Sequence, residues 1–377
     1  MPEVLYHPLW RRVAQRGLVT ILLSLAAVAA IEGVSSLALM IRDARRAAPT
    51  RPKSNFPQAA YDSTIGWVGL PNLSIPNNFG PGLSLTTTAD GMRIHRPVMP
   101  QLFPGERRAI CSGDSFTYGS GVSDGETFCA VIEHEIPGLV TLNMAQRGFG
   151  IDQAYLWYRR DGSRYSHQLH LFAFIWNDFE RMTLRSFWGY SKPILRLKDG
   201  RLVTENVPVP PWAGTRETSA SSSVLAESRL VQLVQRLAGP SESAQLRRVE
   251  TQIWDVAEAV FHDLARLNRQ RGSVLVLVYL PAPSDLLPGP YDARRKKLAD
   301  FSKRSGISLI DLTPEIRQLP ADTLDWFFIT PNALPVGGSA GHYTAAGHRW
   351  VATRLAEHLR AIPAAAAALP APEGATR

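Results

Sequence analysis

The chain has 377 residues, of which 45% are hydrophobic and 20% are charged. These fractions are those of a globular protein and exclude a largely disordered chain. The formal net charge of +8 is concentrated at the beginning, because residues 1–53 carry eight Lys and Arg against three Asp and Glu. Such a basic end is typical of a membrane flank and is poor evidence for nucleic-acid binding, so no nucleic acid is expected as a partner.

An apolar stretch over residues 17–41 contains Glu32 as its one charged residue. Twenty-five helical residues, at about 1.5 Å each, exceed the roughly 30 Å hydrocarbon core of a bilayer. The stretch is long for a cleaved signal peptide, and no clean small-x-small site ends it. We therefore predict a cytoplasmic basic segment at residues 1–16 and a single-pass transmembrane anchor at 17–41. The rest of the chain would lie outside the cytoplasmic membrane, facing the periplasm or the exterior.

Composition divides the remainder into three parts. Residues 42–60 are rich in Arg, Pro, Ala and Ser and are interpreted as a linker. A globular domain is predicted over residues 61–362, with an insertion at about 180–248 that is interpreted as a lid or a substrate-recognition element. The Ala- and Pro-rich residues 363–377 are predicted to be a disordered tail.

Hydrophobic periodicity within the domain predicts strands that alternate with helices. Up to residue 107, Gly, Pro, Asn and Thr predict short strands and turns. Buried strands are predicted from short apolar runs at residues 109–111, 139–143, 170–176, 273–280 and 307–312. Helices are predicted at residues 126–136, 152–160, 249–271, 291–305 and 344–361. This alternation predicts an α/β fold, in which helices cover both faces of a parallel sheet.

The insertion has its own local signals. Residues 194–197 and 202–205 flank an Asp-Gly turn signal and predict a β-hairpin. A Pro-rich stretch, a Ser-rich run and an amphipathic helix at about 224–238 are predicted to follow. Three aromatic residues stand just before the hairpin, and they either stack on a sugar ring or pack a small subsidiary core: Phe187, Trp188 and Tyr190.

The two cysteines, Cys111 and Cys129, form neither a disulfide framework nor a metal-site pattern. They are predicted to be buried thiols, although an oxidising compartment would permit a bridge if the geometry allowed it. The histidines lack metal-ligand spacing, and the sequence has no Walker or dinucleotide glycine loop. Neither a metal nor an organic cofactor is expected.

The strongest chemical signal is a serine that follows a predicted buried strand. Ser115 stands after Gly113 and Asp114, at the carboxyl end of the run 109–111, where open α/β sheets place their ligands. A serine hydroxyl is a poor nucleophile until a base takes its proton and donors stabilise the oxyanion. His342 stands in a loop just before the last predicted helix and is the candidate base.

Two further residues are candidate oxyanion donors. Asn143 and Gly148 flank the end of the second predicted strand, and Asn177 follows the third. The backbone N–H of Gly148 and the side-chain amide of Asn177 are therefore expected to converge near Ser115. His348, in the first turn of the last predicted helix, is interpreted as structural.

These blocks together resemble the SGNH (GDSL-type) hydrolases. Gly113-Asp114-Ser115 is similar to the nucleophile block of that family, and residues 143–148 are similar to its Asn-x-x-x-x-Gly block. Residues 176–178 resemble the Gly-x-Asn-Asp block, with Trp176 where the family usually has glycine, and His342 resembles the base. The resemblance covers residues 108–361 without the insertion. It implies a flavodoxin-like sandwich, ester hydrolysis or acyl transfer, and an oxyanion contact from the backbone N–H of Ser115 itself.

One position departs from the family pattern. The family usually has an aspartate two or three residues before the base, whereas this chain has Ala340 and Ser339. A backbone carbonyl or a distant carboxylate then orients His342, or a Ser–His dyad acts alone, or the activity is weakened. Asp114 and Asp178 are not obvious substitutes, because carboxylates at strand ends more often accept backbone N–H bonds.

Three functions follow as hypotheses. The first is a membrane-anchored serine esterase or deacylase acting on an acylated small molecule, an O-acetylated cell-envelope glycan or a lipid ester. The second is an O-acyltransferase in envelope polysaccharide modification, since only the acceptor that resolves the acyl-enzyme differs. The third is a catalytically silent carbohydrate-binding protein on the same scaffold, which the missing aspartate motivates.

Overall fold

The computed structural model describes residues 58–99, 101–211, 242–324, 326–335 and 338–371, with short helical pieces between residues 16 and 34. Much of the anchor predicted at 17–41, including Glu32, lies outside these residues, as do residues 1–15 and 42–57, the Ser-rich run and the helix predicted at 224–238. None of the helices in the described residues has the length and apolar character needed to cross a bilayer. The anchor therefore stays a prediction.

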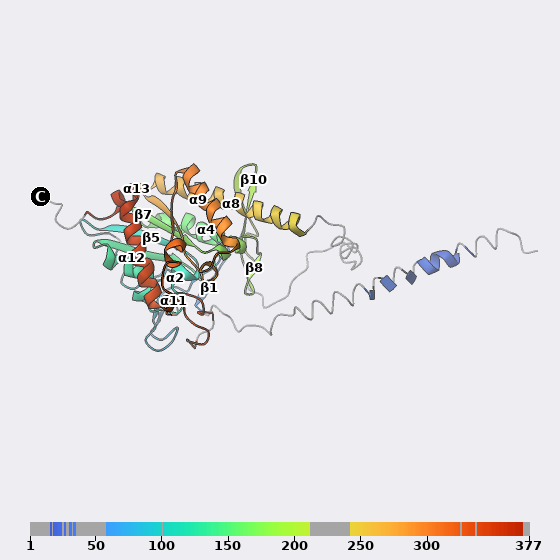
Figure 1. Cartoon of the computed structure of the whole chain (residues 1–377), viewed down its shortest axis with the longest axis horizontal. Coiled ribbons are helices and arrows are strands. Elements are labelled where there is room, and N and C mark those ends of the chain that lie inside the picture. Colours follow the sequence, from blue (N-terminus) through green and yellow to red (C-terminus); the bar gives the residue numbers. More distant parts are fainter. Residues whose placement is uncertain are drawn as a thin grey trace, which may run out of the picture. The chain divides into compact units, whose positions relative to one another are not determined.

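In the described part of the chain, five parallel strands form the central sheet (Figure 1). They are β5 (Arg107–Gly113), β6 (Leu139–Ala145), β7 (Leu169–Phe174), β12 (Val274–Tyr279) and β13 (Ser308–Asp311). Their order across the sheet is β13-β12-β7-β5-β6, and each neighbouring pair is parallel. Counted from β5, this is the flavodoxin-like order 2-1-3-4-5. The predicted parallel sheet is confirmed, and each strand lies within three residues of its predicted bounds.

The sheet is buried on both faces because its strands are continuous apolar runs whose side chains alternate between the faces. In β7, Phe172 and Phe174 join one hydrophobic cluster, while Leu171 and Ala173 join the other. Strand β12 divides in the same way, with Leu277 and Val278 on opposite faces. Both faces therefore require a covering layer.

Helices supply these two layers and confirm the predicted sandwich (Figure 1). The first cluster contains apolar side chains of α4 (Ile151–Asp161), α5 (Trp176–Arg181), α8 (Glu242–Gln270) and α9 (Pro290–Ser305). The second contains those of α3 (Phe128–Glu135), α12 (Ala345–Ala361) and α13 (Pro363–Ala368). The sheet and the site described below belong to one compact unit, residues 53–215 and 250–377.

Short elements surround this sandwich. Before the sheet stand β1 (Ala59–Asp62), β2 (Gly66–Gly69), β3 (Ser74–Ile75) and β4 (Leu85–Thr86). The described part of the insertion contains β8 (Ser186–Phe187), β9 (Tyr190–Ser191), β10 (Ile194–Lys198) and β11 (Arg201–Glu205). The pairing of β10 with β11 confirms the predicted hairpin. The remaining short helices are α2 (Ser115–Tyr118), α10 (Thr313–Ile316) and α11 (Ala321–Leu324), with 3-10 turns at residues 124–126, 162–164 and 283–285.

The prediction of a disordered tail from residue 363 is wrong for residues 363–371. Pro363 begins α13, where a proline at the first helical position loses no hydrogen bond. The following alanines have the highest helix propensity of any residue. Ala365 and Leu369 are buried in the second hydrophobic cluster, so the helix is held by the core.

Cys111 and Cys129 are both buried, and neither is in a disulfide. Cys111 lies in β5 and Cys129 lies in α3, on the same face of the sheet. Burial, followed by the neighbouring Cys129 thiol, raises the pKa of Cys111 well above its ordinary value. The prediction of two buried thiols is confirmed.

Candidate active site

The turn that contains Ser115 begins where β5 ends. Gly113 passes so close to β7 that a Cβ there would lie 2.4 Å from the carbonyl oxygen of Ala173, so no larger residue fits. Asp114 then caps the short helix α2, because its Oδ1 accepts the backbone N–H of Phe116 at 2.9 Å. Ser115 is the first residue of α2 and so stands just beyond the carboxyl end of β5.

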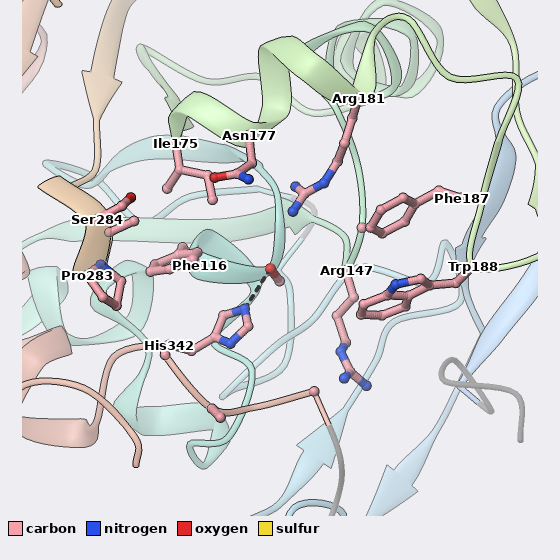
Figure 2. A pocket seen from close by; sticks show the side chains of 16 residues that line it. Phe116, Arg147, Ile175, Asn177, Arg181, Phe187, Trp188, Pro283, Ser284 and His342 are labelled. Carbon is pink, nitrogen blue, oxygen red and sulfur yellow. Dashed lines mark hydrogen bonds between the residues drawn. The ribbon is translucent and has the colours of Figure 1, made fainter. Parts of the chain in front are cut away.

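The structure brings Ser115 and His342 together from positions 227 residues apart (Figure 2). The distance between Ser115 Oγ and His342 Nε2 is 2.8 Å, and the dashed line in the figure marks this bond. The other ring nitrogen, Nδ1, lies 3.1 Å from the backbone carbonyl oxygen of Ser339. Because a carbonyl only accepts, Nδ1 carries the proton, and Nε2 is left to accept the hydroxyl of Ser115.

The loop before α12 fixes the position of His342. Its backbone carbonyl accepts the N–H of Ile329 at 2.7 Å. The next side chain, Tyr343, is buried and donates its hydroxyl to the carbonyl of Pro281 at 2.7 Å. On the pocket side, the ring of Phe116 packs against the imidazole with 4.7 Å between centroids. The histidine is therefore held by backbone bonds and packing, in the loop that the sequence predicted.

Electrostatics keeps the imidazole neutral. Burial lowers the pKa of His342 to about 4, against the opposing effects of the Asp114 charge and of the bond to Ser339. Arg147 and Arg181 lower it further by charge repulsion. At neutral pH the ring is therefore unprotonated, which is the form that a general base requires.

Gly148 and Asn177 line the same cavity as Ser115 and His342, a pocket of about 480 Å³. Gly148 has a φ of +76°, a left-handed conformation that favours glycine. It follows Arg147, whose carbonyl accepts the indole N–H of the buried Trp67 at 3.0 Å. Asn177 stands in the first turn of α5, and Figure 2 shows its side chain at the pocket wall. The four predicted site residues thus share one pocket.

Asn143 does not line this pocket. Its Nδ2 donates to the carbonyl of Thr117 at 2.8 Å, and its Oδ1 accepts the N–H of Ala145 at 3.2 Å. It therefore joins the end of β6 to helix α2. His348 is likewise buried away from the reacting groups, and its Nδ1 accepts the N–H of Phe128 at 3.1 Å.

Among the described residues, the carboxylates near the site do not orient the histidine. Asp114 Oδ2 lies 3.3 Å from Ser115 Oγ, while its Oδ1 accepts a backbone N–H. Asp178 Oδ2 accepts the N–H of Ile175 at 3.0 Å, as expected of a carboxylate at a strand end. Burial, and next the charge of Asp114, raise the pKa of Asp178 well above its ordinary value. Of the alternatives that the missing aspartate left open, the structure contains the backbone carbonyl.

The pocket also contains residues that the motif analysis did not single out. Arg181 bonds Asp178, and its Nη1 lies 3.0 Å from the carbonyl of Phe149 and 3.4 Å from Asp114 Oδ2. Arg147 enters the wall beside Gly148. The sequence offered one signal for Arg147, which is its place within the block at residues 143–148. It offered no signal that Arg181 or the carbonyl of Ser339 would lie at the site.

The aromatic residues of the insertion take two different positions. Tyr190 is buried and packs against Trp67, with ring centroids 5.9 Å apart. Phe187 and Trp188 line the pocket and stack on each other at 4.9 Å. Among the described residues, no group of three or more His, Cys, Asp or Glu side chains is placed to hold a metal ion.

Comparisons with known proteins find similarity at the level of structure. No protein-family model matches the chain, and no curated protein matches it. One similar solved structure is a member of the lipolytic protein G-D-S-L family from Veillonella parvula, at 12% identity and a TM-score of 0.37, covering 66% of this chain and 96% of that one. Another is a lipase/acylhydrolase from Enterococcus faecalis, at 12% identity and a TM-score of 0.35, covering 68% and 96%.

A third is a catalytic mutant of an acetylxylan esterase from Geobacillus stearothermophilus. It shares 11% identity with this chain at a TM-score of 0.36, and the match covers 69% of this chain and 95% of that one. Because identity and TM-score are this low, none of these activities is carried over to the present chain.

Proposed function

We propose that this protein is a serine esterase or deacylase in which Ser115 is the nucleophile and His342 the general base. One observation carries the proposal: Ser115 Oγ lies 2.8 Å from His342 Nε2 at the wall of an accessible pocket. A hydroxyl and a neutral imidazole at this separation, with the second ring nitrogen fixed by an acceptor, form an activated nucleophile. The bond to Ser339 supplies that acceptor.

In the first half of the reaction, Oγ of Ser115 attacks the acyl carbonyl carbon while its proton passes to Nε2 of His342. The carbonyl oxygen becomes an oxyanion, and the N–H groups of Ser115 and Gly148 and the amide of Asn177 are assigned to stabilise it. The intermediate collapses as the imidazolium returns the proton to the leaving alkoxide. The alcohol leaves, and an acyl-serine remains.

In the second half, His342 takes a proton from a water molecule that attacks the acyl-serine. The carboxylic acid leaves, and Ser115 recovers its proton. A sugar hydroxyl in place of water would turn the same steps into O-acyl transfer. The proposal is hydrolysis, and transfer is the alternative that an acceptor experiment distinguishes.

The proposed location follows from the sequence. A single helix at residues 17–41 would anchor the chain in the cytoplasmic membrane, with the site facing the periplasm or the exterior. The substrate at such a surface would be an acylated glycan, lipid or small molecule. Resistance of the full chain to carbonate extraction from membranes would support the anchor, and release into the soluble fraction would contradict it.

The direct test uses the full-length protein and p-nitrophenyl acetate. We expect hydrolysis by the wild type, and a loss of about 10⁴-fold or more in Ser115→Ala and His342→Ala, because the two residues act as a unit. A fluorophosphonate probe should label the wild type at Ser115 and leave Ser115→Ala unlabelled. Equal rates in wild type and variants would reject the mechanism. Acetyl transfer to an added saccharide, detected by mass spectrometry, would reassign the enzyme as an acyltransferase.

A further inference from the structure

The pocket around Ser115 has a cationic wall. Of the described residues that line it, two are arginines and none is Asp or Glu. Figure 2 shows both arginines, Arg147 and Arg181, on the same side of the pocket as the aromatic residues Phe187 and Trp188. A cavity lined in this way favours a ligand that carries negative charge.

The two arginines are not equivalent. Arg181 is paired with Asp178 and Asp114 beneath the nucleophile, so two carboxylates offset its charge. Arg147 is only 4% exposed, and burial lowers the pKa of its guanidinium. A guanidinium taken out of water is stabilised by a bidentate contact with a carboxylate or another oxyanion. Arg147 is also the arginine that lies beside Trp188 in this lining, so an anionic group held against the indole would lie next to its guanidinium.

Trp188 occupies a position that a tryptophan rarely takes. It forms the two-residue turn between β8 and β9 with Gly189, and both residues have positive φ, +50° and +83°. Such turns favour Asn-Gly or Asp-Gly, because a large side chain is strained at positive φ. In this strained conformation Trp188 lines the pocket and is 42% exposed. The ring of Phe187 stacks on its indole. Strain held at a ligand cavity points to a binding role.

The charged and aromatic groups meet at one place. A Cβ on Gly338, itself a pocket residue, would lie 3.1 Å from Arg147 Nη2 and 3.7 Å from Trp188 Cη2. The tip of the indole and the guanidinium therefore border the same small region, within the cavity that contains Ser115. An aromatic face beside a charged donor suits a sugar ring that carries a carboxylate.

We propose that the substrate is an acylated acidic saccharide, whose carboxylate binds Arg147 and whose ring lies against Trp188 while its ester reaches Ser115. This inference rests on the proposed esterase function and narrows its substrate class. It also has a consequence for the chemistry. Arg147 and Arg181 both oppose protonation of His342. A bound carboxylate offsets part of that repulsion, and so it assists the proton transfer from Ser115 to His342.

The test compares two substrates that differ only in charge, methyl tri-O-acetylglucuronoside and its C6 carboxamide. Acetate release by the full-length protein gives kcat/KM for each. We expect the acid to be preferred by about ten-fold or more, as charged hydrogen bonds contribute at this level. Arg147→Gln should abolish the preference, mainly through KM, and Arg147→Lys should restore part of it. Arg304→Gln, which removes an exposed arginine on α9, is the matched control and should keep the full preference.

A binding measurement tests the inference separately from turnover. In the Ser115→Ala background, titration calorimetry should show the acid binding about ten-fold or more tightly than the amide, and Arg147→Gln should equalise them. Trp188→Ala should weaken both ligands, while Trp326→Ala, which removes another exposed tryptophan, should weaken neither. Equal binding of acid and amide, or a preference that survives Arg147→Gln, would overturn the inference.

The two proposals fail in different ways. If the enzyme cleaves p-nitrophenyl acetate but cleaves neither saccharide, or cleaves the two saccharides equally, the esterase proposal stands and the acidic-saccharide inference is rejected. A protein that cleaves no ester but binds the acid preferentially through Arg147 loses the esterase function and keeps the binding site.

Discussion

The guanidinium of Arg93 and the carboxylate of Asp124 form a buried ion pair, 2.8 Å between Nε and Oδ1, next to the turn that contains Ser115. The same guanidinium donates to the carbonyls of Tyr118 and Gly119 at 2.8 and 2.6 Å. Asp124 therefore neutralises the charge of Arg93, and the Arg93 guanidinium satisfies the carbonyl groups at the end of α2. The residue that fixes the turn containing Ser115 thus comes from the strand-and-turn segment before the sheet.

Arg93→Met should destabilise the fold strongly. It leaves Asp124 buried without its partner and removes donors from the carbonyls at the end of α2, so we expect a loss of about 3–5 kcal/mol in the free energy of unfolding. Urea denaturation of the full chain measures it. Arg96→Met is the control, because Arg96 pairs with Glu133 but is 44% exposed and should cost less than about 1 kcal/mol. Similar losses in the two variants would contradict this account.

The orientation of His342 by a backbone carbonyl predicts that the side chain at position 339 is dispensable. Ser339→Ala keeps the carbonyl that accepts from Nδ1, so kcat/KM for p-nitrophenyl acetate should stay close to the wild-type value. His342→Ala, which removes the base, should lose nearly all activity. A large loss in Ser339→Ala, with an unchanged melting temperature, would show that the hydroxyl takes part.

Asn177→Ala tests the third proposed oxyanion donor. The side chain is exposed at the pocket wall, so its removal should leave thermal stability unchanged. If its amide binds the oxyanion, kcat should fall roughly 10²–10³-fold while KM changes little, because the contact forms in the transition state. An unchanged kcat would leave the backbone N–H groups of Ser115 and Gly148 as the donors.

The low pKa of His342 predicts activity well into the acidic range. The base works only when neutral, and its pKa is lowered to about 4. Plotted against pH, kcat/KM should therefore be half-maximal near pH 4 and reach its plateau at about pH 5, one unit above that pKa. Samples returned to pH 7 after each assay control for unfolding. A midpoint near the ordinary histidine value of 6.5 would contradict the described environment.

Stability should depend on pH through two other buried histidines. Burial lowers the pKa of His348 to about 3 and that of His170 well below its ordinary value of 6.5. Below pH 6.5 the unfolded chain binds protons that the folded chain does not. The stability that these groups contribute is therefore complete above about pH 6.5 and is lost as pH falls toward their folded values, by about 1.4 kcal/mol per histidine per pH unit.

Denaturation at pH 7.5 and pH 5.5 measures this dependence. His348→Gln should be less stable at pH 7.5, since the acceptor for the Phe128 N–H is changed, yet it should lose less stability on acidification than the wild type. His134→Gln, in the exposed part of α3, is the control and should keep the wild-type dependence. The same slope in all three proteins would contradict the role of His348.

The sheet and its covering helices could be predicted from hydrophobic periodicity, because burial leaves a local pattern of apolar residues in the sequence. A strand buried on both faces must be apolar throughout, as β7 and β12 are, and a covering helix must repeat its apolar residues every three or four positions. The prediction of a disordered tail was wrong because the local pattern there does not reveal burial. Its alanines and prolines are compatible with disorder as well as with a helix, and the contact of Ala365 and Leu369 with the core, which the local sequence does not show, favours the helix α13.

By itself, the sequence predicted that Ser115 and His342 would meet, because Ser115 follows a buried strand and His342 precedes a helix, and parallel strands end at one edge of a sheet. Three matters were decided only by tertiary structure. The acceptor for His342 Nδ1 is a backbone carbonyl, which every residue possesses and no motif records. Arg147 and Trp188 both approach Gly338, although the three residues lie far apart in the sequence. The pKa of His342 is lowered because burial and two distant arginines act on it through space, and no stretch of sequence contains those distances.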